Sequence, residues 1–331
     1  MERFWKGLAL KGLARTAAAA VFVAAAGAAH AEDKISIGLS TWVGYGPLYI
    51  AQDQGFFKDE GLSVDLVKME DPKTRMPAMI AGRIDMAVTT IDTVLNFYSP
   101  KHPLTYLFAL DESTGGDGIV ADKDIKTIKD LKGKKVAFAE GSVSQFFLGA
   151  LLHKEGMKLS DVDAVNMTAG DAGAAFVAGR VQAAVTWEPW LTRGKETDHG
   201  HLLIDSSKAP GLIVDIATTT DAYAKAHQAD IKKLYKAWAK AVAWQKANPE
   251  KANAIMAKGV GGWLSKPDVF AETLSGVTYF GADKNASFIG TADKPGAMIG
   301  TIEQAVTIGK ETGQFDQKVD PAKMVDYSVV N

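Results

Sequence analysis

Cysteine is absent from the 331 residues of the chain. Without cysteine the chain can form no disulfide, no thiolate metal site and no lipid-modified anchor. An exported form of the protein would therefore depend on its hydrophobic core, which a chain of this length is able to supply. We expect a freely soluble protein and not a lipoprotein.

No excess of charge of one sign marks the chain, since 37 lysines and arginines stand against 39 aspartates and glutamates. Without residues 1–31 the balance is 33 basic against 38 acidic residues, a net charge of −5. Proteins that bind nucleic acid concentrate basic side chains on one face, and no such cluster is present in the sequence. We therefore expect no nucleic-acid partner.

The motifs of common enzymes are also missing, because there is no Gly-x-Ser-x-Gly turn and no phosphate-binding loop. The six histidines are scattered. Only His199 and His201 lie close together, in a polar stretch that is more typical of solvated surface than of a metal site. We expect no catalytic residue, no metal and no cofactor.

Long apolar runs are lacking beyond the N-terminus, and the run at the N-terminus is short. It covers residues 16–29 and follows a leader with Arg3, Lys6, Lys11 and Arg15. The small-x-small sequence at residues 29–31 completes the pattern of a secretory signal peptide. A membrane anchor would need about 20 apolar residues. We predict cleavage before Glu32, a periplasmic location and no membrane insertion afterwards.

An internal duplication is visible in the remaining sequence. Residues 81–89 and 178–186 are identical at six of nine positions, at a separation of 97. Upstream, residues 58–62 are echoed by residues 154–157 in the same order. Two echoes at nearly one offset predict two related lobes.

Each lobe alternates strand-like and helix-like segments, which predicts parallel sheets flanked by helices. The expected strands are residues 34–39, 63–67, 85–88, 135–139, 163–167 and 182–186, and the expected helices are residues 47–54, 75–81, 145–155 and 172–178.

After Asp221 the chain becomes helical, with an amphipathic segment over residues 231–247. Such a region is expected to pack back on the first lobe, so the chain would cross between lobes near residues 119–121 and 213–218. The predicted organisation is a signal peptide at 1–31, a first lobe at 32–119 plus 218–331, and a second lobe at 120–217. Two crossings would form a hinge beside a ligand cleft.

Four sequence blocks in this order resemble the nitrate/sulfonate/taurine family of ABC-transporter solute-binding proteins. They are Gly46-Pro47-Leu48-Tyr49-Ile50-Ala51, Gly55-Phe56-Phe57-Lys58-Asp59-Glu60-Gly61-Leu62, Ala81-Gly82-Arg83-Ile84-Asp85 and Trp187-Glu188-Pro189-Trp190. The resemblance covers residues 34–221. It implies a type II periplasmic-binding-protein fold, in which two doubly wound α/β lobes are joined by a two-strand hinge, and a cognate permease with its ATPase as partner.

Two other functions remain open beside transport of a small-molecule ligand. A biosynthetic enzyme could use the same fold, although the motifs above argue against it. A sensory module that presents ligand to a receptor would use the same clamp, so the sequence does not separate it from a transport protein.

The loops that follow the strands are the candidate ligand site, because ligands of doubly wound sheets bind beyond the carboxyl ends of the strands. The Ser142, Ser144 and Thr90 hydroxyls either contact the ligand there or cap their helices. The predicted ligand-binding residues are Trp42, Tyr45, Gly46, Thr89, Thr90, Asp111, Asp117, Ser142, Val143, Ser144, Trp187, Glu188 and Asp215.

These loops contain several carboxylates and no lysine or arginine, which bears on the ligand's charge. One like-charge contact at about 4 Å costs on the order of 4 kcal/mol at an effective dielectric of 20. This cost exceeds the stabilisation that a helix N-terminus gives to a bound anion. The sequence therefore favours a cationic, neutral or zwitterionic nitrogen compound, taurine included. An alkanesulfonate- or nitrate-type anion, the family's usual ligand, is the alternative.

Overall fold

Residues 33–331 are the part of the chain that the computed structural model describes, so the predicted signal peptide lies outside it. The strands are β1 (Asp33–Leu39), β2 (Leu62–Lys68), β3 (Met86–Thr90), β4 (Leu104–Ser113), β5 (Asp117–Asp122), β6 (Lys135–Phe138), β7 (Asp163–Asn166), β8 (Ala183–Trp187), β9 (Gly200–Asp205), β10 (Val214–Thr220) and β11 (Val277–Tyr279). The α-helices are α1 (Gly46–Asp53), α2 (Phe56–Asp59), α3 (Pro72–Ile80), α4 (Ile91–Phe97), α5 (Val143–Lys154), α6 (Ala169–Val177), α7 (Trp190–Lys195), α8 (Asp221–Ala226), α9 (Gln228–Ala247), α10 (Pro249–Val260), α11 (Pro267–Thr273), α12 (Ala282–Ile289) and α13 (Met298–Glu311).

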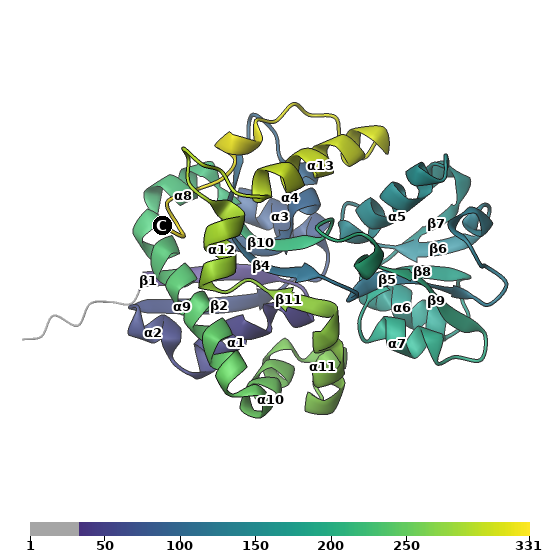
Figure 1. Cartoon of the computed structure of the whole chain (residues 1–331), viewed down its shortest axis with the longest axis horizontal. Helices are drawn as coiled ribbons and strands as arrows, with labels where there is room; N and C mark the ends of the chain where they lie inside the picture. The colour runs from purple at the N-terminus through teal and green to yellow at the C-terminus, as the bar shows by residue number, and fades with distance from the viewer. Residues whose placement is uncertain (1–32) are drawn as a thin grey trace, which may run out of the picture. The chain divides into compact units, whose positions relative to one another are not determined.

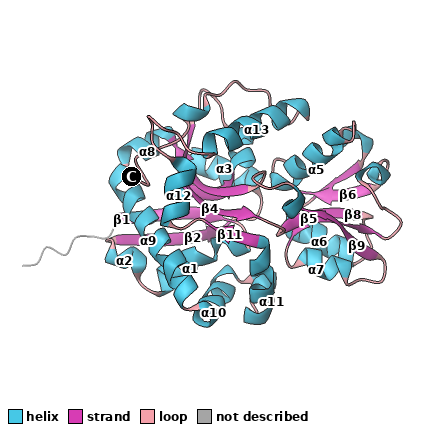
Figure 2. Cartoon of the chain, viewed as in Figure 1, coloured by secondary structure: helices cyan, strands magenta, loops and turns pink. Residues whose placement is uncertain are grey.

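The strands form two sheets with helices packed against them (Figures 1 and 2). The six-stranded sheet has the order β11-β4-β10-β3-β1-β2, and the five-stranded sheet has the order β7-β6-β8-β5-β9. None of the helices described between residues 33 and 331 combines the length and apolar character needed to cross a bilayer.

The predicted duplication corresponds to a repeated β-α-β-α-β unit. Strand β1 pairs in parallel with β2 and β3, and β6 pairs in parallel with β7 and β8 in the same way. The repeated motif at 81–89 and 178–186 is the turn from α3 into β3 and from α6 into β8. Both turns need a glycine, because Gly82 and Gly179 each have φ +67°.

The predicted parallel pairing is present within each repeated unit, but each sheet as a whole is mixed. Strand β10 inserts antiparallel between β3 and β4, and β5 lies antiparallel between β8 and β9. These pairings join segments that lie from 62 residues (Ala121 and Ala183) to 131 residues (Ala87 and Thr218) apart in the chain, which local sequence patterns do not specify.

The chain passes between the sheets at residues 114–116 and 206–213. The predicted crossings, 119–121 and 213–218, fall mostly inside strands β5 and β10. The two connecting segments contact each other, since the Gly115 amide donates to Ser206 Oγ at 2.8 Å. Ser206 Oγ also lies 2.9 Å from Ser113 Oγ at the end of β4.

The helical C-terminal region packs on the elements around the six-stranded sheet and supplies its edge strand β11. Helix α9 contacts α1 and α2, with ion pairs from Lys236 to Glu60 and from Lys240 to Asp59, both at 2.7 Å. Its fully buried Trp238 donates from Nε1 to the Phe280 carbonyl at 2.9 Å. The expectation that this region has no strand of its own is corrected by β11.

Candidate functional site

A cavity of about 40 Å³ is lined by elements of both sheets. Its lining residues are Ser40, Trp42, Tyr45, Glu70, Pro72, Arg75, Thr89, Thr90, Thr93, Asp117, Ala139, Ser142, Val143, Ala169, Trp187 and Asp215. Nine of the thirteen predicted ligand-binding residues are among them; that these nine contact a ligand stays a prediction.

Strand topology brings these residues together. Parallel β1 and β3 end at the same edge of their sheet, so the loop after Leu39 lies beside Thr89 and Thr90. Antiparallel β10 begins at that edge, and its Asp215 pairs with Thr90. In the other sheet Asp117, the first residue of β5, pairs with Trp187, the last residue of β8.

Two tryptophans, Trp42 in the loop after β1 and Trp187 at the end of β8, form an aromatic wall of the cavity. The Trp42 and Trp187 rings lie edge to face, with centroids 6.2 Å apart and planes at 73°. Each indole is fixed by a hydrogen bond, from Trp42 Nε1 to Asp111 Oδ1 at 3.1 Å and from Trp187 Nε1 to the Thr41 carbonyl at 3.0 Å. The second bond joins the two sheets across the cavity.

Two buried carboxyl groups line the cavity. The Asp215 side chain is 3 % exposed and Asp117 is 6 % exposed. Burial, above all, raises the pKa of Asp215 to about 8, although a hydrogen bond that the Tyr45 hydroxyl donates to Asp215 Oδ1 acts in the opposite direction. Burial likewise raises the pKa of Asp117 to about 7, although a hydrogen bond with the Ser113 side chain acts to lower it. Both groups hold protons for part of the time near neutral pH.

A third predicted carboxyl, Asp111, lies behind the cavity wall. It is fully buried on β4, where it pairs with Asp215 on β10, and Oδ2 has no hydrogen-bond partner among the described residues. Burial and then the Asp215 charge raise its pKa well above the usual range. Gly44 packs so tightly here that a Cβ atom would overlap the Asp111 carboxyl group. Asp111 holds Trp42 in place and does not line the cavity.

A basic side chain does reach the cavity, so the prediction of a site without one is wrong. The guanidinium of Arg75 on α3 is buried, and burial lowers its pKa. Nη1 donates to the Met69 carbonyl at 2.5 Å, and Nη2 donates to Thr89 Oγ1 at 3.4 Å. Within residues 33–331 no carboxylate lies within ion-pairing distance of Arg75. Arg75 lies in a helix, so the rule that ligands bind in the loops after strands does not select it.

Of the other predicted residues outside the cavity lining, Gly46 and Glu188 have structural contacts, and Ser144 has a buried hydroxyl group. Gly46 begins α1 against Met256. The carboxylate of Glu188 accepts hydrogen bonds from the amide of Thr192 at 3.0 Å and from its hydroxyl at 2.9 Å. Ser144 is buried in the first turn of α5, and its hydroxyl has no partner among the described residues.

The two helix starts at the cavity behave differently. Ser142 caps α5, because its Oγ accepts from the Ser144 amide at 3.1 Å. Thr90 makes no such cap and its hydroxyl lies 2.8 Å from Thr93 Oγ1. The capping alternative therefore describes Ser142 and not Thr90.

The lining residues that the sequence did not predict are Ser40, Glu70, Pro72, Arg75, Thr93, Ala139 and Ala169. Glu70 accepts from the Thr41 amide and, at 2.6 Å, from the Thr41 hydroxyl, so it shapes the loop after β1. Ser40 and Ala139 adjoin predicted residues and could have been found by extending the same loops.

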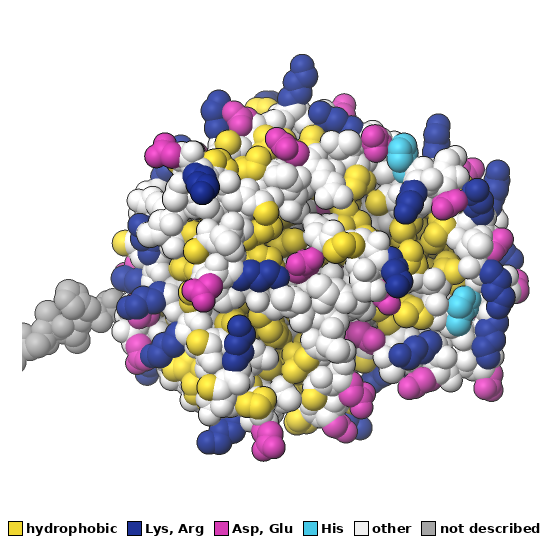
Figure 3. Space-filling view, in the orientation of Figure 1, with side chains coloured by type: hydrophobic (Ala, Val, Ile, Leu, Met, Phe, Trp, Pro, Cys, Tyr) yellow, Lys and Arg dark blue, Asp and Glu magenta, His cyan; other side chains and the backbone are white. Residues whose placement is uncertain are grey.

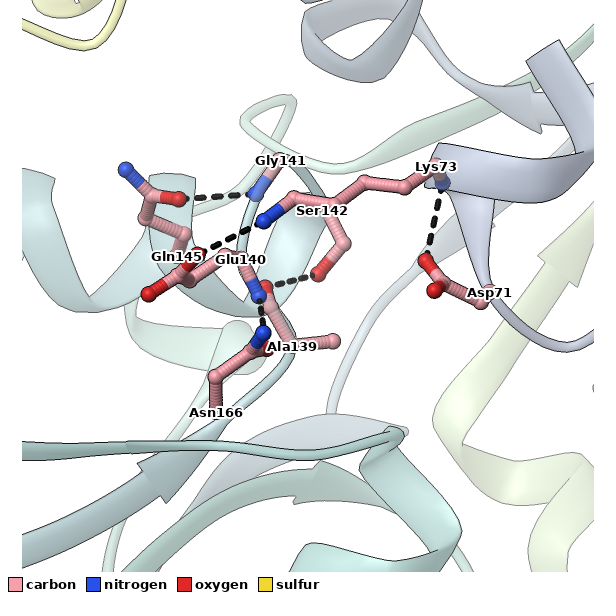
Figure 4. Close-up of polar contacts among 8 residues, drawn as sticks. All are labelled: Asp71, Lys73, Ala139, Glu140, Gly141, Ser142, Gln145 and Asn166. Atoms are coloured by element: carbon pink, nitrogen blue, oxygen red, sulfur yellow. Dashed lines mark hydrogen bonds and ion pairs between the residues drawn. The ribbon is translucent and has the colours of Figure 1, made fainter. Parts of the chain in front are cut away.

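An ion pair bridges the two sides beside the cavity (Figure 4). Lys73, next to the lining residue Pro72, places Nζ 2.6 Å from Oε2 of Glu140, next to the lining residue Ala139. Both side chains are about half exposed. The Glu140 amide donates to Asn166 Oδ1 at 3.1 Å, which fixes the loop that carries it.

Charged side chains elsewhere are dispersed. On the face in Figure 3, lysines and arginines alternate with aspartates and glutamates, without a continuous area of one sign. In the described part of the chain no group of three or more His, Cys, Asp or Glu side chains is arranged to hold a metal ion.

The family model described as NMT1/THI5 like matches residues 42–252. The taurine-binding periplasmic protein of Escherichia coli is 25 % identical over 295 residues, which cover 85 % of this chain and 87 % of that protein. The periplasmic aliphatic sulphonate binding protein SsuA from E. coli superposes with a TM-score of 0.69 and 21 % identity, covering 90 % of this chain and 99 % of that one.

The same fold also carries an enzyme. The desulfurization enzyme DszB matches with a TM-score of 0.62 and 14 % identity, over 90 % of this chain and 97 % of that one. Together with the two mixed sheets, these structural matches confirm the predicted periplasmic-binding-protein fold.

Proposed function

The chain belongs to the NMT1/THI5-like family, and on this premise we propose that it is the solute-binding component of an ABC importer, capturing a small nitrogen-containing polar solute in the periplasm. Its partners would be that solute and a cognate permease with its ATPase. Names of relatives support this role, since the taurine-binding protein resembles the chain over most of its length.

One observation carries the choice of solute: Asp117 and Asp215 line a cavity with aromatic walls and have no ion-pair partner within residues 33–331. A carboxylate attracts an ammonium or guanidinium group, and the faces of Trp42 and Trp187 favour such cations. The cavity, of about 40 Å³, supports a compact solute and not a large one.

Closure of two lobes about the segments 114–116 and 206–213 is the proposed capture mechanism. Cavity residues come from both sides, so a bound solute would contact both lobes only when they are closed. Differential contact of this kind shifts the population toward the closed form. The Trp187–Thr41 hydrogen bond and the Lys73–Glu140 ion pair would then form on closure.

A second candidate is an anion of the alkanesulfonate or nitrate type, and Arg75 favours it. A buried guanidinium without a carboxylate partner among the described residues can accept an oxyanion, and the hydroxyls of Thr89, Thr90 and Ser142 line the same cavity. Protonation of Asp117 and Asp215 would reduce their repulsion of such an anion.

A thermal-shift screen of the mature protein tests both candidates. Methylammonium, guanidinium, urea, taurine, ethanesulfonate and nitrate would be compared at equal ionic strength. A true ligand at 100 times its Kd stabilises the protein by about 2.7 kcal/mol, which raises Tm by about 5 °C for a chain of this size. Stabilisation by nitrogen compounds supports the first candidate, and stabilisation by ethanesulfonate or nitrate alone contradicts it.

A binding role also predicts that the ligand is recovered unchanged. Incubating the protein with its ligand and analysing the mixture by mass spectrometry tests this, and formation of a new compound would favour an enzyme. Growth on the solute as nitrogen source, lost when the gene is deleted, would separate transport from sensing.

A further inference from the structure

We propose that the cavity takes a compact monovalent nitrogen cation and releases a proton when the cation binds. This inference rests on the proposed solute-binding function and narrows the ligand to one charge class. Neutral and zwitterionic solutes would then be poor ligands of the same cavity.

The arrangement of the carboxyl groups is the first reason. Asp111 and Asp215 face each other on neighbouring antiparallel strands, and Asp117 lines the same cavity as Asp215. All three are buried, and within residues 33–331 no lysine or arginine lies within ion-pairing distance of any of them. Asp111 is repelled by the charges of Asp215 and Asp117, and Asp215 by that of Asp117, and buried like charges that repel one another cannot all be ionised, so at least one carboxyl keeps its proton in the empty site.

Other titratable or charged groups surround these three, and each comes from a different part of the fold. They are Tyr45 before α1, Glu70 before α3, Arg75 on α3, Asp92 on α4, Tyr279 on β11 and Lys284 on α12. Two of these groups are cationic. Arg75 faces Asp215 without pairing with it, and Lys284 lies 3.5 Å from Glu112. The charges of Arg75 and Lys284 act to lower the pKa of Asp215 and Asp111 respectively, but neither cation forms an ion pair with these carboxyls, whose pKa values stay raised.

The proton balance follows from this arrangement. A cation entering beside Asp117 and Asp215 stabilises their ionised forms, so the protonated carboxyl loses its proton to solvent while the ligand keeps its charge. The raised pKa values of these two groups, about 7 and about 8, put the exchange near neutral pH. A neutral solute has no charge to exchange and would leave the proton in place.

Size and shape give the second reason. The cavity is small, about 40 Å³, and its walls include the aromatic rings of Trp42, Tyr45 and Trp187. The described residues offer no group of three His, Cys, Asp or Glu side chains for a metal ion. A small organic monocation meets both conditions.

Guanidinium and urea form a matched pair of probes, since both are small and planar and they differ in charge. Isothermal titration calorimetry at pH 7, in two buffers of different ionisation enthalpy, measures proton release directly. We expect about half a proton or more released per guanidinium bound, none for urea, and affinity for guanidinium about tenfold higher at pH 8 than at pH 6. Methylammonium serves as a second cation. The Asp53→Asn variant, which changes an exposed carboxyl group, serves as the control and should give the same results as the wild-type protein.

The outcomes separate this inference from the proposed function. Cation binding without proton release and with pH-independent affinity overturns the inference and leaves the solute-binding function standing. Preference for urea or taurine over guanidinium overturns it as well. Binding of ethanesulfonate or nitrate alone overturns both the inference and the proposed nitrogen-containing solute, and supports the anion candidate. Carboxyl ¹³C shifts of the empty protein between pH 5 and pH 9 give an independent measurement, and full ionisation of Asp117 and Asp215 at pH 6 would refute the inference without any ligand.

Discussion

Replacing Asp215 with asparagine should stabilise the empty protein at pH 8 while weakening cation binding. The asparagine keeps the shape and an oxygen that can accept the hydrogen bond from Tyr45, but it has no charge. In the wild-type protein burial raises the pKa of Asp215 to about 8, whereas an unfolded aspartate has a pKa of about 3.9.

The sign of the stability change follows from the direction in which folding shifts the pKa of Asp215. Between pH 4 and pH 8 the folded protein keeps the Asp215 proton and the unfolded chain loses it, so stability falls as pH rises through this window. At 1.36 kcal/mol per pH unit the loss has an upper limit of about 6 kcal/mol. We expect Asp215→Asn to exceed the wild-type stability at pH 8 by about 2 to 6 kcal/mol, with a difference near zero at pH 4.

Thermal unfolding of the ligand-free protein at pH 5, 6, 7 and 8 provides the assay. At about 2 °C per kcal/mol, the variant should gain roughly 4 to 12 °C over wild type at pH 8. Guanidinium affinity of the same variant should fall at least about tenfold, because one cavity carboxylate is gone. Asp53→Asn should follow the wild-type profile. A stability difference that stays constant from pH 5 to pH 8 would refute the argument that Asp215 is protonated in the folded state.

Further predictions concern the other charged and aromatic groups of the site. Arg75→Met should preserve or improve binding of monocations and abolish any binding of sulfonates, measured by calorimetry; the opposite pattern would support the anion candidate. Glu140→Gln removes the ion pair with Lys73, and because both side chains are about half exposed, the expected loss of ligand affinity is small, about two- to fivefold, and should shrink in high salt. Trp187→Phe removes the hydrogen bond to Thr41 and should speed ligand dissociation in stopped-flow measurements while altering Tm by under about 4 °C; an unchanged dissociation rate would mean that this bond does not hold the closed form.

Much of the fold was predictable because its signals are local. Short segments of sequence are enough to show the alternation of strands and helices, the proline at the start of α1 and the glycine turns at Gly82 and Gly179. The predicted bounds of the strands and helices agree with the structure to within about three residues. The duplication predicted the repeated unit for the same reason. The mixed character of the sheets could not be predicted, because β5 and β10 pair with strands that are distant in sequence.

The candidate site divides in the same way. Its loops follow from the rule that ligands bind beyond strand ends, so Trp42, Asp117 and Trp187 were found. Arg75 was missed because it enters from the middle of a helix, and Asp111 was placed in a loop although it belongs to β4 and lies behind Trp42, outside the cavity lining. The sequence around Arg75 and Asp111 does not indicate where their side chains lie relative to the cavity.

By itself the sequence determined the order of the strands and helices, the family, and the abundance of acidic side chains near the strand ends. These features depend on the spacing of hydrophobic residues, on turn residues and on composition, which are all properties of short segments. Only the tertiary structure decided which carboxyls meet the cavity, that Arg75 accompanies them, and how strongly they hold protons. Those properties depend on burial and on distances between charges carried by different strands and helices, and both are set when β10 and β5 take their places in the two sheets.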